Sequence, residues 1–237
     1  MRKFMDVQTA GRHTALAVIA ILAISACSRS GPEMAYASGR NASAVAAVQH
    51  VSKSSPAAAL RLVLAPDGNA ARYRVRERLV EHDFPNDAVG ETKSLTGAIS
   101  FDKSGKVIRD VSKFTVDAGT FVSDQSRRDG YVRRHLLEAD TYPTITLVPT
   151  DVKGVKLPLP SSGTAPLEMT GDLTVRGVTR PTLWRGTARF QNGAVAGSLT
   201  TSFTFDEMQI EQPEVPVLLS VADTIKLEID FKLLEQH

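Results

Sequence analysis

The stretch IKLEIDFKL, which covers residues 225–233, decides the fold. Apolar residues occupy its odd-numbered positions, and charged residues occupy its even-numbered positions. Because successive side chains of a β-strand point to opposite faces, this alternation predicts a strand with one buried face and one face in water. A strand that is wet on one side is typical of an antiparallel sheet.

The same alternation continues toward the N-terminus, in residues 95–101, 167–175 and 195–205. A further strand near residue 72 would carry four arginines on one face, at positions 72, 74, 76 and 78. We interpret this face as a wet one whose arginines pair with acids on neighbouring strands. The alternative is a basic surface that rests against anionic lipid head groups.

Turn residues separate the predicted strands. Residues 102–105 and 192–193 carry the Asp, Asn and Gly of tight turns. Residues 86–92 and 158–166 are expected to be longer loops. Residues 126–139 are expected to form the one helical segment, with Gly130 as its weakest point.

These patterns predict the all-β class, with about eight antiparallel strands in a single barrel and one short helical segment. Closure into a barrel is favoured because it removes exposed strand edges. A β-sandwich made of the same strands is the alternative. An eight-stranded barrel has room for one small ligand.

The N-terminus carries a 13-residue apolar run, residues 14–26, after a basic flank. Such a run is shorter than the ~20 residues that span a bilayer, so it predicts a secretory signal segment. Its last residues, Ile24, Ser25 and Ala26, precede Cys27 and resemble the lipobox of bacterial lipoproteins, in which the cysteine thiol receives a diacylglycerol. A cleavable signal beside a chance cysteine and a one-span anchor are the alternatives.

The resulting organisation has three parts. Residues 1–26 are the expected lipoprotein signal peptide, residues 27–58 a lipidated cysteine and flexible tether, and residues 59–237 the barrel domain. Two or more acyl chains hold a protein stably on a membrane. The resemblance to lipoproteins, with Ser28 rather than Asp after the cysteine, implies an exported protein at the outer membrane that faces the periplasm.

Composition excludes several functions. The signal segment has three basic residues and one acidic residue, so 25 residues of each sign remain in the rest, and this balance does not favour nucleic acid as a partner. Cys27 is the only cysteine, so no disulfide can form within the chain. The histidines lack metal-ligand spacing, and the sequence has no nucleophile motif or phosphate-binding glycine loop. We therefore expect no enzyme, no metal and no resident cofactor.

Three segments resemble the YceI-like family of secreted bacterial proteins: LTGAISFD at residues 95–102, RRD at 127–129 leading to DTYPTI at 140–145, and LTVRGVTRP at 173–181. The resemblance implies a lipocalin-like barrel whose interior accommodates a long isoprenoid chain, such as a polyprenyl phosphate or a quinone tail. Two departures concern the ligand. Arg176 stands where the family often has histidine, and residues 206–208 differ from the family's motif.

The predicted ligand-binding residues form two groups. The expected cavity wall consists of Leu95, Ile99, Phe101, Leu173, Val175, Trp184, Leu199, Phe203, Leu227 and Ile229. Candidates for binding an acidic head group at the barrel mouth are Arg127, Arg128, Arg133 and Arg134. The alternative for these arginines is a solvated turn in which they pair with Asp129, Glu138 or Asp140.

The sequence leaves two functions open. In the first, a lipid-anchored protein carries an apolar isoprenoid-type lipid, and its partners are that lipid and the membrane. In the second, the barrel is filled by its own side chains and serves as an interaction or structural module of the cell envelope. Inward phenylalanines such as Phe101, Phe203 and Phe231 are large enough for such a filled interior.

The Cys27→Ser variant tests the anchor. It should leave the membrane fraction and lose labelling by a fatty-acid probe, because the thiol that accepts the lipid is gone. Fractionation of cells and probe labelling measure this. A variant that fractionates and labels like the wild type would contradict the lipoprotein prediction.

Overall fold

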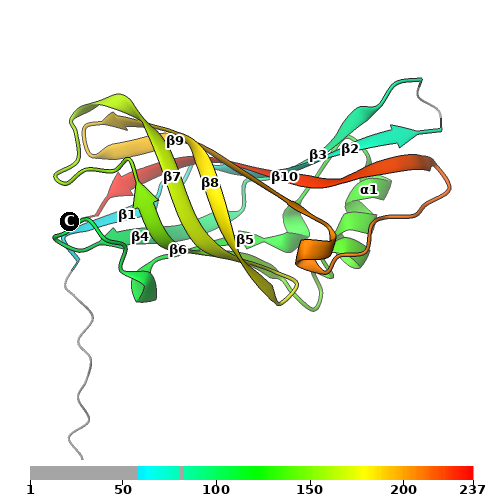
Figure 1. Ribbon diagram of the computed structural model, residues 1–237, viewed down its shortest axis with the longest axis horizontal. Helices are drawn as coiled ribbons and strands as arrows, with labels where there is room; N and C mark the ends of the chain where they lie inside the picture. The colour runs from blue at the N-terminus through cyan, green and yellow to red at the C-terminus, as the bar shows by residue number, and fades with distance from the viewer. Residues whose placement is uncertain (1–57, 81–82, 237) are drawn as a thin grey trace, which may run out of the picture. The chain divides into compact units, whose positions relative to one another are not determined.

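The computed structural model describes residues 58–80 and 83–236 (Figure 1). Cys27, the predicted signal segment and most of the predicted tether lie outside the described residues. The strands are β1 Leu60–Leu64, β2 Ala70–Leu79, β3 Asn86–Thr92, β4 Leu95–Phe101, β5 Lys113–Asp117, β6 Thr144–Lys153, β7 Ser162–Val175, β8 Val178–Gln191, β9 Ala194–Thr204 and β10 Leu218–Glu235.

The helical elements are short. They are the 3-10 turns η1 Arg109–Val111, η2 Ala118–Thr120 and η4 Asp206–Met208, the α-helix α1 Ser126–Tyr131 and the π-turn η3 Val132–Leu136 that continues it. The helical segment expected within residues 126–139 is therefore confirmed, although it is shorter. In the described part of the chain, no helix has the length and apolarity to cross a membrane.

Eight strands close an antiparallel barrel, in the order β1, β4, β5, β6, β7, β8, β9, β10 and back to β1. The predicted all-β barrel with about eight strands is confirmed. From β4 to β10 each strand pairs with the next one along the chain, which is the arrangement that tight turns produce. At Asn192 and Gly193 both residues have a positive φ, 46° and 78°, as the predicted hairpin turn requires.

The strand β10 pairs along both of its edges. One edge pairs with β9 from Thr224 to Leu234. The other edge pairs first with β2, up to Asp230 opposite Ala70, and then with β1, from Leu233 opposite Leu64. β10 is therefore the strand that joins the barrel to the additional strands β2 and β3.

The partner of β10 changes at Lys232, between β2 and β1. The backbone N–H of Lys232 donates to Oδ1 of the buried Asn69 at 2.8 Å. Its carbonyl accepts from the N–H of Ala65 at 2.8 Å, and the Asn69 amide donates to the carbonyl of Ala65 at 2.7 Å. The turn at residues 65–69 thus satisfies the backbone groups of β10 where strand pairing stops.

Strands β2, β3 and the first half of β10 form an arm that extends from the end of the barrel where α1 lies (Figure 1). Three of the four arginines of β2, Arg72, Arg74 and Arg76, pair with acids, as expected. Arg72 contacts Glu91 at 2.5 Å and Asp230 at 2.6 Å. Arg74 and Arg76 share Asp87 at 3.2 Å and 3.0 Å.

Three sequence-based expectations about strands were wrong or incomplete. Residues 86–92 are strand β3 and not a loop, because they pair with β2 throughout and bury Ala88, Gly90 and Thr92 in alternation. Residues 158–166 form a loop only up to Ser162, where β7 begins. The short strand β1 was not expected at all.

The glycine in β3 explains why this strand was missed. Gly90 lies opposite Tyr73 of β2. A Cβ atom at position 90 would lie 2.2 Å from the Tyr73 ring, so only glycine allows the ring to cover this strand. Such a residue weakens the strand pattern in the sequence while it enables the packing.

Shortened chains test the role of β1. A chain that starts at Ala58 should give a β-rich circular dichroism spectrum and one cooperative melting transition, because it retains the whole barrel. A chain that starts at Pro66 lacks Leu60 and Leu62, which are buried, and leaves β4 and β10 unpaired at the closure. At roughly 1.5–3 kcal/mol for each leucine, its free energy of unfolding should fall by about 3–6 kcal/mol. Equal stability of both chains in urea would contradict closure by β1.

Candidate functional site

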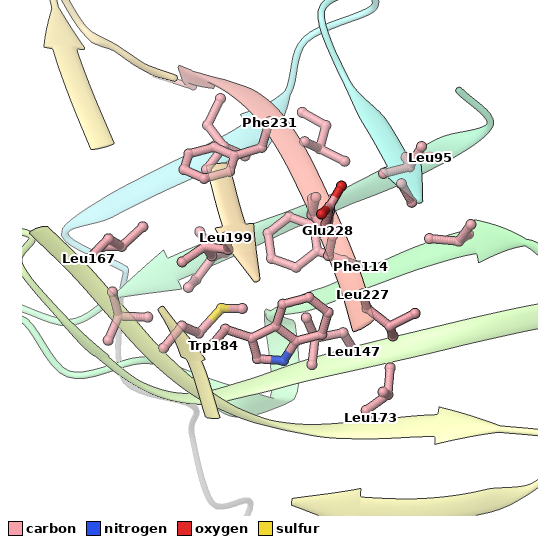
Figure 2. A pocket seen from close by; sticks show the side chains of 18 of the residues that line it. Leu95, Phe114, Leu147, Leu167, Leu173, Trp184, Leu199, Leu227, Glu228 and Phe231 are labelled. Carbon is pink, nitrogen blue, oxygen red and sulfur yellow. The ribbon is translucent and has the colours of Figure 1, made fainter. Parts of the chain in front are cut away.

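A cavity of about 120 Å³ lies inside the barrel (Figure 2). All eight barrel strands supply apolar side chains to its wall. One from each strand, in chain order, is Leu62, Ile99, Phe114, Leu147, Met169, Trp184, Leu199 and Phe231. The odd positions of the stretch 225–233 thus face inward, and the predicted buried face of this strand is the barrel interior.

The Trp184 indole is fixed in the cavity wall. It is 1% exposed, and its Nε1 donates a hydrogen bond to Oγ1 of Thr182 at 2.8 Å. The Thr182 hydroxyl donates in turn to the carbonyl of Gly171 at 2.9 Å. Figure 2 shows the ring among aliphatic side chains that include Leu147. Because its one polar group is satisfied, the ring offers an apolar surface to the cavity.

The polar residues on this wall are Arg72, Thr146 and Glu228. Both charged ones are neutralised by partners. Arg72 pairs with two acids, as described above, and the Glu228 carboxylate contacts Lys226 at 2.8 Å and Arg74 at 3.3 Å. The hydrogen bond from Lys226, and then that from Arg74, lowers the pKa of Glu228. The wall therefore presents no uncompensated charge, and an apolar molecule suits it.

A second cavity, of about 90 Å³, lies at the end of the barrel that α1 and η3 cover. Val132, Leu136 and Leu137 form its helical side. Its strand side consists of Tyr73, Val75, Ile145, Val175, Phe203, Ile225 and Leu227. Phe121, Ile145 and Leu227 line both cavities, so the two spaces adjoin.

A model of the YceI-like domain matches residues 65–233. The chain belongs to the YceI-like family. The match begins after β1 and covers the other strands, except for the last two residues of β10. It also agrees with the resemblance of the three sequence segments quoted above.

Relatives of this YceI-like chain include UPF0312 proteins from two strains of Pseudomonas putida. Each is 26% identical over 193 residues, which cover 74% of this chain and 92% of the relative. The chain thus aligns with nearly the whole length of these relatives.

Two solved structures share the fold. One is a polyisoprenoid-binding domain from Saccharophagus degradans, with a TM-score of 0.58 and 12% identity over 76% of this chain and 100% of that domain. The other is BcnA of Burkholderia cenocepacia, with a TM-score of 0.50 and 14% identity over 69% of this chain and 95% of BcnA.

The structure places every residue of the predicted cavity wall on one of the two cavities. Those on the main cavity are Leu95, Ile99, Phe101, Leu173, Trp184, Leu199, Leu227 and Ile229. Val175 and Phe203 instead line the second cavity. Phe114 and Leu147 also line the main cavity and were not predicted, although the alternation in KFTVD at residues 113–117 is a signal that could have found Phe114.

The four candidate head-group arginines lie on neither cavity wall. Arg128 is half-buried. Its guanidinium forms ion pairs with Glu77, at 2.6 Å, and with Asp124. Arg127, Arg133 and Arg134 are exposed, and they form no ion pair within residues 58–80 and 83–236.

The expected alternative partners of these arginines were wrong. Asp129 accepts hydrogen bonds from the backbone and side chain of Ser123, at 2.8 Å and 2.6 Å. Glu138 pairs with Arg176. Sequence proximity suggested Asp129 and Glu138, but Glu77 on β2 reaches Arg128 because α1 packs against the arm.

Metal-ligand geometry is not found in the described residues, where no group of three His, Cys, Asp or Glu side chains could hold an ion. His135 is exposed, and its ring lies 5.0 Å from the ring of Tyr131. The other four histidines of the sequence, His13, His50, His82 and His237, lie outside the described residues.

Because Tyr73 is partly buried, we expect the stability of the protein to change at alkaline pH. Burial raises the pKa of Tyr73 to about 12, from an ordinary value of 10.0. The folded protein therefore holds this proton more tightly than the unfolded chain. Its contribution to stability is fully present below about pH 10 and is lost as the pH rises toward about 12.

The Tyr73→Phe variant should lose less stability than the wild type over this interval, by roughly 2–3 kcal/mol. Urea unfolding between about pH 9 and pH 12 measures the difference. If the free energies of unfolding of the two proteins changed with pH in parallel, Tyr73 would not be shielded from water.

Proposed function

We propose that this YceI-like protein binds a long, apolar, isoprenoid-type lipid, such as a polyprenyl phosphate or a quinone, in the barrel interior. The observation that carries the proposal is the wall of the main cavity, where apolar side chains from all eight strands meet and every charged group is paired. A ligand there gains by burying hydrocarbon and finds no free charge to bind.

The arrangement of the two cavities supports a chain-shaped ligand. They adjoin at Phe121, Ile145 and Leu227 and follow one another along β10. A linear molecule can occupy both, whereas a compact one fits only a single cavity. The polyisoprenoid-binding domain of Saccharophagus degradans has the same fold, which agrees with this assignment.

The cavity volumes bear on the alternative of a filled barrel. Volumes of about 120 Å³ and 90 Å³ are below the roughly 300–1,000 Å³ of typical ligand pockets. Binding of a long lipid therefore requires side chains to move. Leu227 and Ile229 are only half-buried, so they are the side chains that we expect to shift. A barrel that cannot widen would have no room for such a lipid, and the protein would then be the side-chain-filled interaction or structural module.

We further propose that the protein acts by binding and not by covalent catalysis, and that Cys27 anchors it at the outer membrane, facing the periplasm. The lipobox-like end of residues 14–26 and Ser28 support the location. An anchor keeps the barrel close to a source of apolar lipid.

Leu227→Phe tests the binding proposal. The larger ring should narrow the junction of the two cavities, so binding of long isoprenoids should weaken more than binding of short ones. Each CH₂ group kept out of the cavity should cost ~0.8 kcal/mol, which is about a fourfold loss of affinity. Thr224→Phe is the matched control, because Thr224 is exposed on the opposite face of β10.

The measurements are native mass spectrometry with organic extraction of the purified protein, and titration with isoprenoids of increasing length. A long-chain lipid that copurifies with the wild type and with Thr224→Phe, and less with Leu227→Phe, would support the proposal. Affinity that does not depend on chain length, or no binding to the wild type, would favour the filled barrel.

A further inference from the structure

The strands β8 and β9 pair over only part of their lengths. Their pairing starts at the hairpin turn 192–193 and stops at Arg185 opposite Thr200. Toward the start of β8 and the end of β9, β8 pairs only with β7, and β9 pairs only with β10. In Figure 1 the two strands separate toward η4. A groove of about 760 Å³ lies where they separate, and residues of β8, β9, η4 and β10 line it.

Backbone groups of Leu183 and Ser202 face this groove. In an antiparallel ladder, every second residue bonds to the same neighbouring strand. The odd-numbered residues of β8 from 185 to 191 bond to the even-numbered residues of β9 from 194 to 200, because the last pair flanks a two-residue turn. Leu183 and Ser202 continue this series but do not pair, and no backbone group outside the strands bonds to them within residues 58–80 and 83–236. Each therefore presents one N–H and one C=O to the groove.

The protein itself compensates for the next missing pair along the two strands. Pro181 has no N–H to offer, and proline is typical of a strand edge without a partner. Opposite it, the N–H of Thr204 donates to Oε2 of Glu207 at 2.7 Å. Comparable compensation is not found for Leu183 and Ser202 within the described chain. An open edge of this kind can pair with a further strand.

The charged side chains on the groove wall are mostly basic. Arg180, Arg185 and Lys226 line the groove, and Glu207 is the one acid among its described lining residues. Arg180 donates only to backbone carbonyls, at 3.0 Å and 3.2 Å. The acids that pair with Arg185 and Lys226 are each shared with a second basic residue. The groove therefore complements a ligand of negative charge.

We propose that an extended acidic segment of another protein binds in this groove as an added β-strand. Its main chain bonds to Leu183 and Ser202, and its carboxylates meet Arg180 and Lys226. The side chain of Leu183 is 37% exposed and offers the segment an apolar contact. Because β8 and β9 run in opposite directions, the segment lies antiparallel to one wall and parallel to the other.

The charge of the groove separates this occupant from segments of the protein itself. Residues 28–57 of the same chain have three basic residues and one acidic residue, so they do not complement the groove. In a second copy, the acids of the terminal strand β3 are already paired, because Asp87 and Glu91 bind arginines of β2. Binding in the groove does not require a lipid in the barrel.

The Leu183→Pro variant of the full chain tests the added strand. It removes the N–H that faces the groove but keeps the ladder with β7, because this N–H points away from β7, as the ring nitrogen of Pro181 does. Leu183→Val is the matched control, since it keeps the N–H. The probe is the peptide acetyl-EVTVTVE-amide, titrated by calorimetry. Leu183→Pro should bind it at least about tenfold more weakly, and Leu183→Val like the wild type.

Two further measurements do not depend on the proline. Arg180→Gln should weaken binding at least about threefold, whereas Arg189→Gln should not, because Arg189 is exposed on β8 outside the groove. The same peptide with methylated backbone nitrogens should not bind to the wild type, because it cannot donate to a strand. The acidic peptide should also slow amide hydrogen exchange at Leu183 and Ser202. Circular dichroism melting shows that the variants stay folded.

Equal binding of the normal and methylated peptides, or no binding of the acidic peptide to the wild type, would overturn the proposal. Binding of an oligogalacturonate that Leu183→Pro leaves unchanged would also overturn it, since the groove would then be a site for anionic carbohydrate. Sedimentation of the protein alone gives the remaining outcome. A dimer that Leu183→Pro dissociates would assign the groove to a second copy of the chain and likewise overturn the proposal.

Discussion

The whole structure depends on the double pairing of β10. One edge is occupied by β9, and the other is divided between β2 and β1. The division is possible because Asn69 and Ala65 satisfy the backbone groups of Lys232, where neither strand is present. An unpaired backbone group buried at this point would cost free energy comparable to a lost hydrogen bond. With this junction in place, β1 can turn inward and close the barrel while β2 continues as the arm.

The same strand separates charge from apolar surface. Its even positions carry Glu228 and Asp230, which pair with arginines of β2, and its odd positions face the interior. Such partly exposed ion pairs add little to stability, about 0–1 kcal/mol each. Burial of the odd positions supplies most of the stabilisation. The ion pairs matter for the site, because they hold Arg72 and Glu228 at the edge of an apolar cavity without leaving a free charge there.

How far the sequence predicts this structure depends on the range of the interactions. Alternation and turn residues are local, so they predicted the barrel strands at residues 95–101, 167–175, 195–205 and 225–233, the hairpin at Asn192 and the closed barrel, but not β5 and β6. The inward positions of these strands followed with them. The strand β3 was missed because its pattern is hidden by Asn86, Asp87 and Gly90, and its pairing with β2 became visible only in three dimensions. β1 has five residues and is defined by β4 and β10, which lie far away in the chain. The same limit applies to Arg128, whose partner Glu77 is 51 residues distant.

The geometry of the two cavities selects the shape of a ligand more strongly than its chemistry. Hydrocarbon of any form suits the wall, because its polar groups are satisfied by the protein itself. The constraint is the junction, where Phe121, Ile145 and Leu227 belong to both cavities. Phe101, Trp184 and Phe231 keep the main cavity narrow and are almost fully buried, so they move less readily than Leu227. Movement of Leu227 would join the two cavities along the barrel, whereas widening the main cavity would require the buried aromatic residues to move, so the proposed extended ligand needs the smaller displacement. A rigid ring system would need the buried aromatic residues to be displaced.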